Sequence, residues 1–379
     1  MANIIYFDNS ATTKPCQTAI EYLNKALLEN WGNPSSLHSL GINAEQELLL
    51  SREVIADTIS ASFDEIFFTS GGTESNNLAI FGAVASLKKR GNRIVTSLIE
   101  HPSVLEPFKK LENEGFEVVY LKPDKNGVVS IEELNNAINK NTILVSLMLV
   151  NNETGAIQPV KAAAEAIKRV GSPTLLHSDC VQAFGKMDID VNALGIDLLS
   201  ASAHKIHGPK GVGILYKRKQ KNIIPVTFGG GQQKGIRPGT ENMPLICALR
   251  GAVEELGNVK NNYALVRDLF LYAKEKIVSE FPDATINSND NGLPYILNFS
   301  LNTHRSETIL HYLDAENIFI SSGSACAKGQ KSHVMTALGF DNKRIDSALR
   351  LSFNKHNTKE EIDRFCLVLK KAVSSLRKA

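Results

Sequence analysis

The sequence has little cysteine and no cysteine pair spaced for metal binding. Only five of its 379 residues are cysteine, and none of them forms a Cys-x-x-Cys pair. An odd number of scattered cysteines disfavours both a disulfide framework and a zinc site. We therefore expect no metal site and a reducing compartment. The five are Cys16, Cys180, Cys247, Cys326 and Cys366.

A strong charge of one sign and a membrane-length apolar run are also missing. Lysine and arginine total 42 and aspartate and glutamate total 40, which gives a net charge of +2. This balance does not indicate a nucleic-acid or membrane-surface partner. No apolar run approaches the roughly 20 residues of a membrane span, and the first residues do not resemble a signal peptide. We expect a cytoplasmic protein that contacts neither nucleic acid nor membrane directly.

Short apolar runs alternate with helical patterns through most of the chain. Nearly continuous apolar strands that alternate with helices indicate a parallel sheet covered on both faces, so the expected class is α/β. Further helices at 241–256 and 263–280 lead into a smaller α+β unit. Strands are expected at 66–69, 93–97, 116–121, 143–150, 174–178 and 198–202, and helices at 73–89, 103–114, 131–139 and 160–169.

Two glycines between a strand and a helix form the first candidate site. In the segment 69–73 (TSGGT) the chain leaves a strand through Gly71 and Gly72 and begins a helix at Thr73. Such a turn offers free backbone N–H groups and a positive helix end to an anion. It lacks the lysine of a P-loop. An ordinary glycine turn with a threonine cap is the alternative.

Lys205 and Asp179 each follow an expected buried strand. Burial lowers the pKa of a lysine amine, so Lys205, beside Ser202 and His204, suits a Schiff base with a carbonyl cofactor. A carboxylate at the carboxyl end of a parallel strand lies where α/β sheets bind ligands, and Asp179 could pair with a pyridinium nitrogen. The structural alternatives are a surface lysine at a strand end and an aspartate that caps a short helix.

Cys326 differs from the other cysteines in its surroundings. The flanking segment 321–329 is small, polar and glycine-containing, which is typical of a mobile loop. A lone cysteine is usually a small buried hydrophobic residue, and we interpret the other four in this way. A loop offers no core to fill, so we expect Cys326 to be reactive.

Ten segments in order give the chain a resemblance to the cysteine desulfurases of the NifS/IscS type, which are fold-type I pyridoxal-phosphate (PLP) enzymes of the class-V aminotransferase family. The resemblance covers essentially the whole chain. The matching segments are 6–13 (YFDNSATT), 33–36 (NPSS) with His38, 69–77 (TSGGTESNN), 100–103 (EHPS), 151–155 (NNETG), 179–182 (DCVQ), 202–205 (SAHK), 229–232 (GGGQ), 237–242 (RPGTEN) and 321–326 (SSGSAC).

The resemblance implies a fold and a division of the chain. It implies a mainly parallel seven-stranded sheet flanked by helices in a large PLP-binding domain at 15–257. A small α+β domain at 258–379 would carry a mobile catalytic loop at 321–332, of the long-loop class. An N-terminal arm at 1–14 would join the small domain.

The resemblance also implies a role for each matched residue. Lys205 would bond covalently to PLP, and His101 would stack on the ring and shuttle protons. Cys326 would take sulfur from L-cysteine as a persulfide. Asp179 would lie at the ring nitrogen, and Gln182 would bond the phenolic oxygen, with Asn152 nearby. The phosphate would be bound by Gly72, Thr73, Ser202 and His204, and Thr240 would reach the phosphate of the partner subunit in a homodimer. Arg350, assisted by Asn33, would bind the substrate carboxylate.

The implied reaction converts L-cysteine to L-alanine and passes sulfur to an acceptor protein for iron–sulfur cluster assembly or tRNA thiolation. Cys326 could also ligate a nascent cluster on a scaffold partner, and selenocysteine is a possible second substrate. Two other functions stay open from the residues alone: a small aminotransferase, which would not need Cys326, and a non-catalytic sulfur-relay protein. The chain departs from the family pattern at Ser10, Ile42, Gln233 and 353–355.

Overall fold

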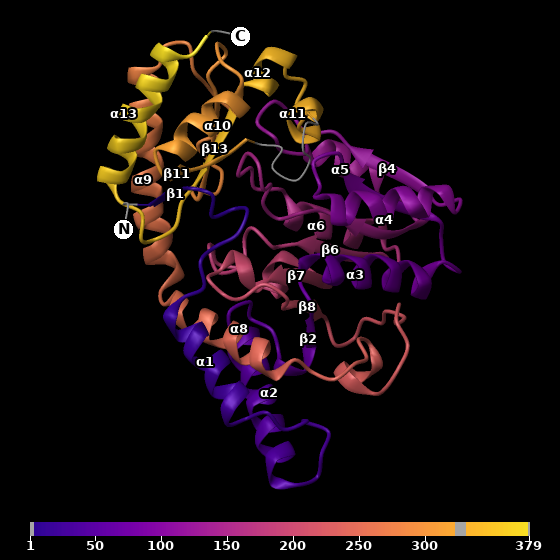
Figure 1. Cartoon of the computed structure of the whole chain (residues 1–379). Helices are drawn as coiled ribbons and strands as arrows, with labels where there is room; N and C mark the ends of the chain where they lie inside the picture. Colours follow the sequence, from indigo (N-terminus) through magenta and orange to yellow (C-terminus); the bar gives the residue numbers. More distant parts are fainter. Residues whose placement is uncertain (1–3, 323–330, 378–379) are drawn as a thin grey trace.

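A seven-stranded sheet forms the centre of the larger part of the molecule, in a computed structural model that describes residues 4–322 and 331–377 (Figure 1). The strand order is β2-β8-β7-β6-β5-β3-β4, and the five strands from β7 to β4 pair in parallel. The predicted α/β class is confirmed. The strands are β2 (Ile66–Thr69), β3 (Arg93–Ser97), β4 (Glu117–Leu121), β5 (Thr142–Ser146), β6 (Leu175–Asp179), β7 (Leu198–Ser202) and β8 (Gly213–Lys217).

Helices cover both faces of this sheet. Alternate strand residues face opposite sides, so Leu144 and Leu198 pack with α3 and α4 while Val145 and Leu199 face the main core with α5 and α6. Burial on both faces explains why these strands read as continuous apolar runs. The covering helices are α3 (Gly72–Leu87), α4 (Pro102–Asn113), α5 (Ile131–Ala137), α6 (Val160–Val170) and α7 (Val191–Leu194).

Two features of the large sheet differ from the sequence prediction. The strand expected at 143–150 is shorter in the structure, where β5 ends at Ser146. Beyond that end, the amides of Leu147 and Leu149 still donate hydrogen bonds to carbonyls of β6. The antiparallel strand β8, which lies between β7 and β2, was not predicted. Strand β8 follows the turn after Lys205. The glycines at 208 and 211 in this turn obscure the beginning of the strand in the sequence pattern.

Three helices extend the large part beyond the sheet. Figure 1 shows α1 (Gln17–Leu28), α2 (Ser39–Asp57) and α8 (Met243–Leu256) packed together, with the α1–α2 connection projecting away from the body of the molecule. The 3-10 turns are η1 (Phe63–Glu65), η2 (Ala203–Lys205) and η3 (Gln232–Gly235). Among the described residues, no helix is both long and apolar enough to cross a membrane.

The C-terminal part contains a four-stranded sheet in the order β12-β13-β10-β9. Its predicted boundary near residue 257 falls in the turn between α8 and α9. The elements are α9 (Val259–Glu280), β9 (Thr285–Ile286), β10 (Ile296–Ser300), α10 (Ser306–Ala315), β11 (Ile318–Phe319), β12 (Ser321–Ser322), α11 (His333–Ala337), α12 (Asn342–Asp346), β13 (Ala348–Ser352) and α13 (Lys359–Ser375).

The N-terminal segment ties these two parts together. Strand β1 (Ile5–Tyr6) pairs in parallel with β11, and Phe7 is fully buried. The Phe7 ring makes edge contacts with Phe353 and Phe365, at centroid distances of 5.5 and 6.2 Å. The chain then passes back toward the large sheet, so the arm contacts the C-terminal part before it reaches α1 (Figure 1).

We predict that Phe7→Ala destabilises the protein by about 3–5 kcal/mol, because it leaves a cavity between the arm and the C-terminal helices. The urea midpoint of unfolding should fall markedly. Ile4→Ala is the matched control, since Ile4 is 60% exposed and its truncation should leave the midpoint nearly unchanged. Equal midpoints for the two variants would contradict the packing role of Phe7.

Candidate active site

A cavity of about 400 Å³ lies at the carboxyl ends of the parallel strands. Parallel strands bring their carboxyl ends to one edge of a sheet, which is where α/β proteins bind ligands. Most of the residues that the sequence singled out line this one cavity: Gly72, Thr73, His101, Asn152, Asp179, Gln182, Ser202, His204, Lys205 and Arg350.

Lys205 ends the short turn η2 directly after β7. Its Nζ donates hydrogen bonds to the backbone carbonyls of Ser10 at 2.5 Å and Ala11 at 2.7 Å. Both carbonyls belong to the N-terminal arm, so the arm fixes the amine at the cavity wall. The predicted lysine therefore lies at the cavity, with its head group held by neutral acceptors.

A buried hydrogen-bond chain connects Asp179 to His101. Asn76 of α3 donates to Asp179 Oδ2 at 2.7 Å and to Ser103 Oγ at 2.8 Å. Ser103 Oγ lies 2.8 Å from His101 Nδ1, and the Ser103 amide donates to the same nitrogen. Because Nδ1 accepts, a neutral His101 carries its proton on Nε2.

Burial sets the charge state of His101. It lowers the pKa of the imidazole, with a smaller lowering by Lys205 and His333, and the carboxylate of Asp179 opposes these effects. The ring is therefore mainly neutral near pH 7. It also caps the N-terminus of α4, since it accepts the Ser103 amide bond, so its position at the cavity is fixed by the helix it begins.

The start of α3 could serve as the anion cradle that the sequence predicted. Gly71 has a φ of +152°, and helix α3 begins at Gly72 without a side-chain cap, which leaves first-turn N–H groups available to an anion. A Cβ on Gly72 would lie only 2.7 Å from the Val181 side chain, so a larger residue would crowd the cradle. Burial and nearby lysines lower the pKa of His204 to about 4, so His204 contributes a neutral N–H donor.

These donors fit PLP. Its phosphate matches the amides and hydroxyls at the start of α3, its ring nitrogen matches the carboxylate of Asp179, and its aldehyde matches the amine of Lys205. The orientation of each group is set by elements that end or begin at the same edge of the sheet. The residues present can thus hold every polar part of this cofactor.

Arg350 reaches the cavity from β13 of the C-terminal sheet. Its Nη1 donates to the Asn152 carbonyl at 2.8 Å, and its Nη2 donates to Asp8 Oδ1 at 2.9 Å. Its Nε is buried and makes no hydrogen bond to the described residues. A guanidinium with an unused buried donor suits an incoming carboxylate.

Two predicted residues are not brought to this cavity, and a third lies outside the described residues. Asn33 lies in the exposed α1–α2 connection and Thr240 lies on the exposed stretch before α8, and neither lines the cavity of its own chain. Cys326 and most of the predicted loop at 321–332 lie outside the described residues. The assistance of Asn33 to Arg350 therefore stays a prediction, as do the roles of Thr240 and Cys326.

The first described residues after Cys326 do line the cavity. Ser332 lies 2.5 Å from Glu153 Oε2, and His333 Nε2 lies 2.9 Å from the Glu100 carbonyl oxygen. Both residues, together with Lys331, form part of the cavity wall. The chain segment that carries Cys326 thus joins the cavity at its C-terminal flank.

Several site residues were not assigned a role from the sequence, although they lie in the matching segments. Asn76 and Ser103 join Asp179 to His101, and Asp8 holds Arg350. Burial raises the pKa of Glu153 to about 7 and that of Glu100 to about 8. An unpartnered buried polar side chain is costly, but burial is not visible in the sequence, so no local signal identified these residues.

The comparisons with known proteins agree with this geometry. The Aminotransferase class-V family model matches residues 5–365. A protein of Methanosarcina thermophila named cysteine desulfurase IscS is 41% identical over 98% of this chain and 93% of its own length. The chain belongs to the class-V aminotransferase family, among the NifS/IscS cysteine desulfurases.

Solved structures of this family have the same fold. A NifS-like protein superimposes with a TM-score of 0.93 and 37% identity, over 99% of this chain and 100% of that chain. A structure described as SspA in complex with cysteine has a TM-score of 0.82 and 35% identity, over 93% and 100% of the two chains. The seven-stranded fold-type I architecture and PLP as the cofactor accord with this family membership.

We predict that Asn76→Asp weakens cofactor binding at least tenfold, because it removes the donor to Asp179 and places a second carboxylate beside it. Absorbance titration of the protein with PLP measures the affinity. Asn77→Asp is the matched control, because Asn77 is on the same helix and, in the described part of the chain, its side chain hydrogen-bonds only to the Thr73 carbonyl. An unchanged affinity of Asn76→Asp would show that Asp179 does not depend on this bond.

Proposed function

We propose that this protein is a PLP-dependent cysteine desulfurase that converts L-cysteine to L-alanine and retains the sulfur on Cys326 as a persulfide. The observation that carries the proposal is the meeting of Lys205, Asp179, His101 and Arg350 in one cavity, together with membership of this family. In the same order, these four residues supply an amine for the cofactor, a carboxylate for the ring nitrogen, an imidazole that can carry protons and a guanidinium that can bind the substrate carboxylate.

The cofactor-binding residues have separate tasks. Asp179 would pair with the ring nitrogen, His101 would contact the ring, and the start of α3 with Ser202 and His204 would bind the phosphate. Lys205 would hold the cofactor covalently until substrate arrives. PLP, when bound, supplies an electron-withdrawing ring that stabilises negative charge at the substrate Cα.

The side chains of the cavity then bind the substrate and move its protons. Arg350 binds the carboxylate of cysteine with its guanidinium, which Asp8 and the Asn152 carbonyl keep in place. Lys205 Nζ removes the proton from Cα, and the neutral imidazole of His101 is placed to pass a proton to or from the substrate. The solved structure of a related protein is described as a complex with cysteine, which supports the same substrate class here.

Cys326 accepts the sulfur. Its thiolate attacks Sγ of the substrate, so that an S–S bond forms as the Cβ–Sγ bond breaks. The bonding electrons stay with the three-carbon fragment, which takes up a proton and leaves as alanine. The persulfide sulfur then passes to an acceptor protein, of the iron–sulfur assembly or tRNA-thiolation kind that the resemblance implies.

A small aminotransferase is the alternative activity within the family. It would use Lys205, Asp179 and Arg350 in the same way but would make no use of Cys326. The Ser332 and His333 contacts favour the desulfurase, because they bring the flank of the cysteine-bearing segment into the cavity wall. Sulfide release from cysteine, compared with amino transfer to pyruvate, separates the two activities.

A homodimer is part of this proposal. Large apolar side chains are exposed around the α1–α2 connection, with Trp31 at 65% and Leu37 at 95% exposure, and Phe228 is 87% exposed. Asn33 and Thr240 lie in the same two exposed stretches of chain. An apolar surface of this kind favours association, and it would carry both residues toward the site of a partner subunit.

The proposed compartment is a reducing one such as the cytoplasm. The four described cysteines, Cys16, Cys180, Cys247 and Cys366, are free thiols. Burial raises the pKa of each of these thiols. They are therefore weak nucleophiles, and the sulfur acceptor role falls to Cys326.

We expect L-cysteine to add one sulfur atom to the peptide that contains Cys326, as measured by mass spectrometry of the PLP-loaded protein. Cys326→Ser should lose this sulfur and almost all alanine formation. Cys16→Ser should retain both, because Cys16 lies outside the large cavity. Full alanine formation by Cys326→Ser would refute the role of Cys326.

We expect the double variant Leu28→Glu/Trp31→Glu to be monomeric by light scattering and to bind PLP more weakly, because Thr240 would no longer reach a neighbouring phosphate. Leu367→Glu is the control, since Leu367 is also half exposed but lies on α13 of the C-terminal part. A monomeric wild-type protein with full cofactor affinity would contradict the proposed dimer.

A further inference from the structure

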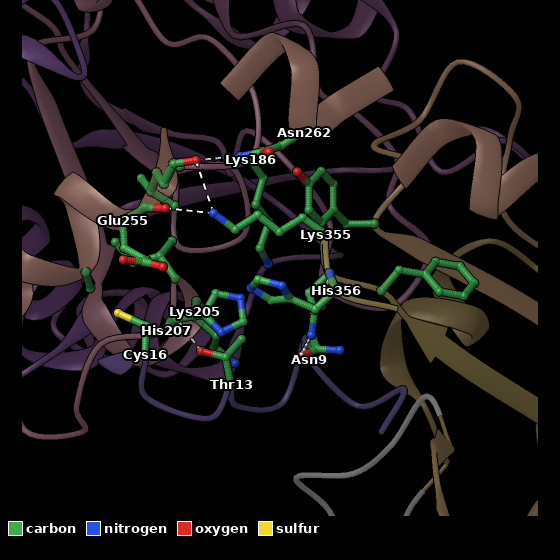
Figure 2. A pocket seen from close by; sticks show the side chains of 17 residues that line it. Asn9, Thr13, Cys16, Lys186, Lys205, His207, Glu255, Asn262, Lys355 and His356 are labelled. Carbon is green, nitrogen blue, oxygen red and sulfur yellow. Dashed lines mark hydrogen bonds between the residues drawn. The ribbon is translucent and has the colours of Figure 1, made fainter. Parts of the chain in front are cut away.

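Lys186 is a buried lysine to which the proposed function gives no task. Only 5% of its surface is exposed, and its Nζ donates to Gln182 Oε1 at 3.2 Å. With Lys205 it lines a second, smaller cavity that lies between the N-terminal arm and the turn after β13. Figure 2 shows both lysines among the side chains of this cavity.

The charged groups that shift the pKa of Lys186 are positive. Burial and then the charges of Lys205 and Arg350 lower the pKa of its amine to about 7. Lys186 in turn lowers the pKa of His204 and His207, and the Tyr295 ring centroid is 5.8 Å from its Nζ. The smaller cavity also contains Lys355, His356 and Glu255.

The carboxylate of Glu255 does not neutralise Lys186. It accepts a hydrogen bond from Thr18, and within the described ranges no ion pair involves Lys186. A buried ammonium without an anion is costly. Its position therefore requires a reason other than stability of the cofactor-free protein.

The hydrogen bonds of Lys186 and of the Ser10 carbonyl together determine how the Gln182 amide is turned. An ammonium group only donates, so it must face the amide oxygen of Gln182 and leave the NH₂ group on the other side. That NH₂ group donates to the Ser10 carbonyl at 3.0 Å. The same carbonyl accepts from Lys205 Nζ, so the Gln182 donor points to the place where the head group of Lys205 lies.

We propose that Lys186 is a positioning residue for the cofactor: through Gln182 it aims a hydrogen-bond donor, backed by a positive charge, at the phenolic oxygen of PLP bound at Lys205. This inference rests on the cofactor assignment of the proposed function. The phenolic oxygen, as an anion, compensates the buried charge. The same charge disfavours a proton on the nitrogen that links Lys205 to the cofactor, because the two positive charges repel.

The test is a pH titration of the visible absorption band of the PLP-loaded protein without substrate, in the wild type and in Lys186→Met. The nitrogen of the Lys205 linkage should hold its proton to a pH about one unit higher in Lys186→Met, since a nearby charge has been removed. Lys186→Arg, which keeps the charge and the donors, should titrate near the wild-type midpoint. High salt should leave the difference in place, because buried charges are screened weakly.

Two further outcomes decide the proposal. Lys186→Gln keeps a hydrogen-bond donor but has no charge, so the midpoint of its titration should also rise. This variant replaces Lys186→Met in the test if Lys186→Met does not fold. Unchanged midpoints in the Met or Gln variant, or an equal rise in Lys186→Arg, would overturn the role of Lys186. Borohydride reduction of the wild type separates this from the cofactor assignment: a product without cofactor on Lys205 would overturn the proposed function itself.

Discussion

The shared direction of the strands in the large sheet fixes where the chemistry of this protein can take place. Strands β3, β5, β6 and β7 are neighbours in parallel, so the residues that follow them converge at one edge. Asp179 ends β6, and Lys205 follows β7 by one short turn. Residues that are far apart in the sequence thus lie close together, because the parallel pairing brings the ends of their strands to the same edge of the sheet.

The N-terminal arm makes the site complete. It pairs with β11, buries Phe7 against α13, and then presents the carbonyls of Ser10 and Ala11 to Lys205. Its Asp8 also holds Arg350, which comes from the C-terminal sheet. One short segment therefore contacts both the amine proposed to bind the cofactor and the guanidinium proposed to bind the substrate.

The sequence predicted the parts of the fold that depend on local pattern. The strand at 66–69 and the strand at 198–202 agree with β2 and β7 residue for residue, because buried parallel strands are short apolar runs with clear ends. Strands β1 and β11 have only two residues each. Their pairing depends on the tertiary structure, and no pattern so short could predict it.

The same distinction applies to the site. Lys205 and Asp179 could be predicted because each is a polar residue directly after an apolar strand. Asn76 could not, because it lies within α3 and its importance comes from reaching both Asp179 and Ser103. Residues that act through another side chain have no signature of their own in the sequence.

Buried polar groups that a stable core would avoid lie in and beside the cavity. Glu100 is fully buried and one of its carboxylate oxygens has no partner among the described residues. Asp8 is held near Arg350 at the cost of desolvation, which raises the pKa of its carboxyl. An apolar core would be at least as stable as such pairs. Arg350 shows why such groups are better explained by binding than by folding. Its buried Nε has no partner among the described residues and lies at the cavity, where a charged ligand can satisfy it.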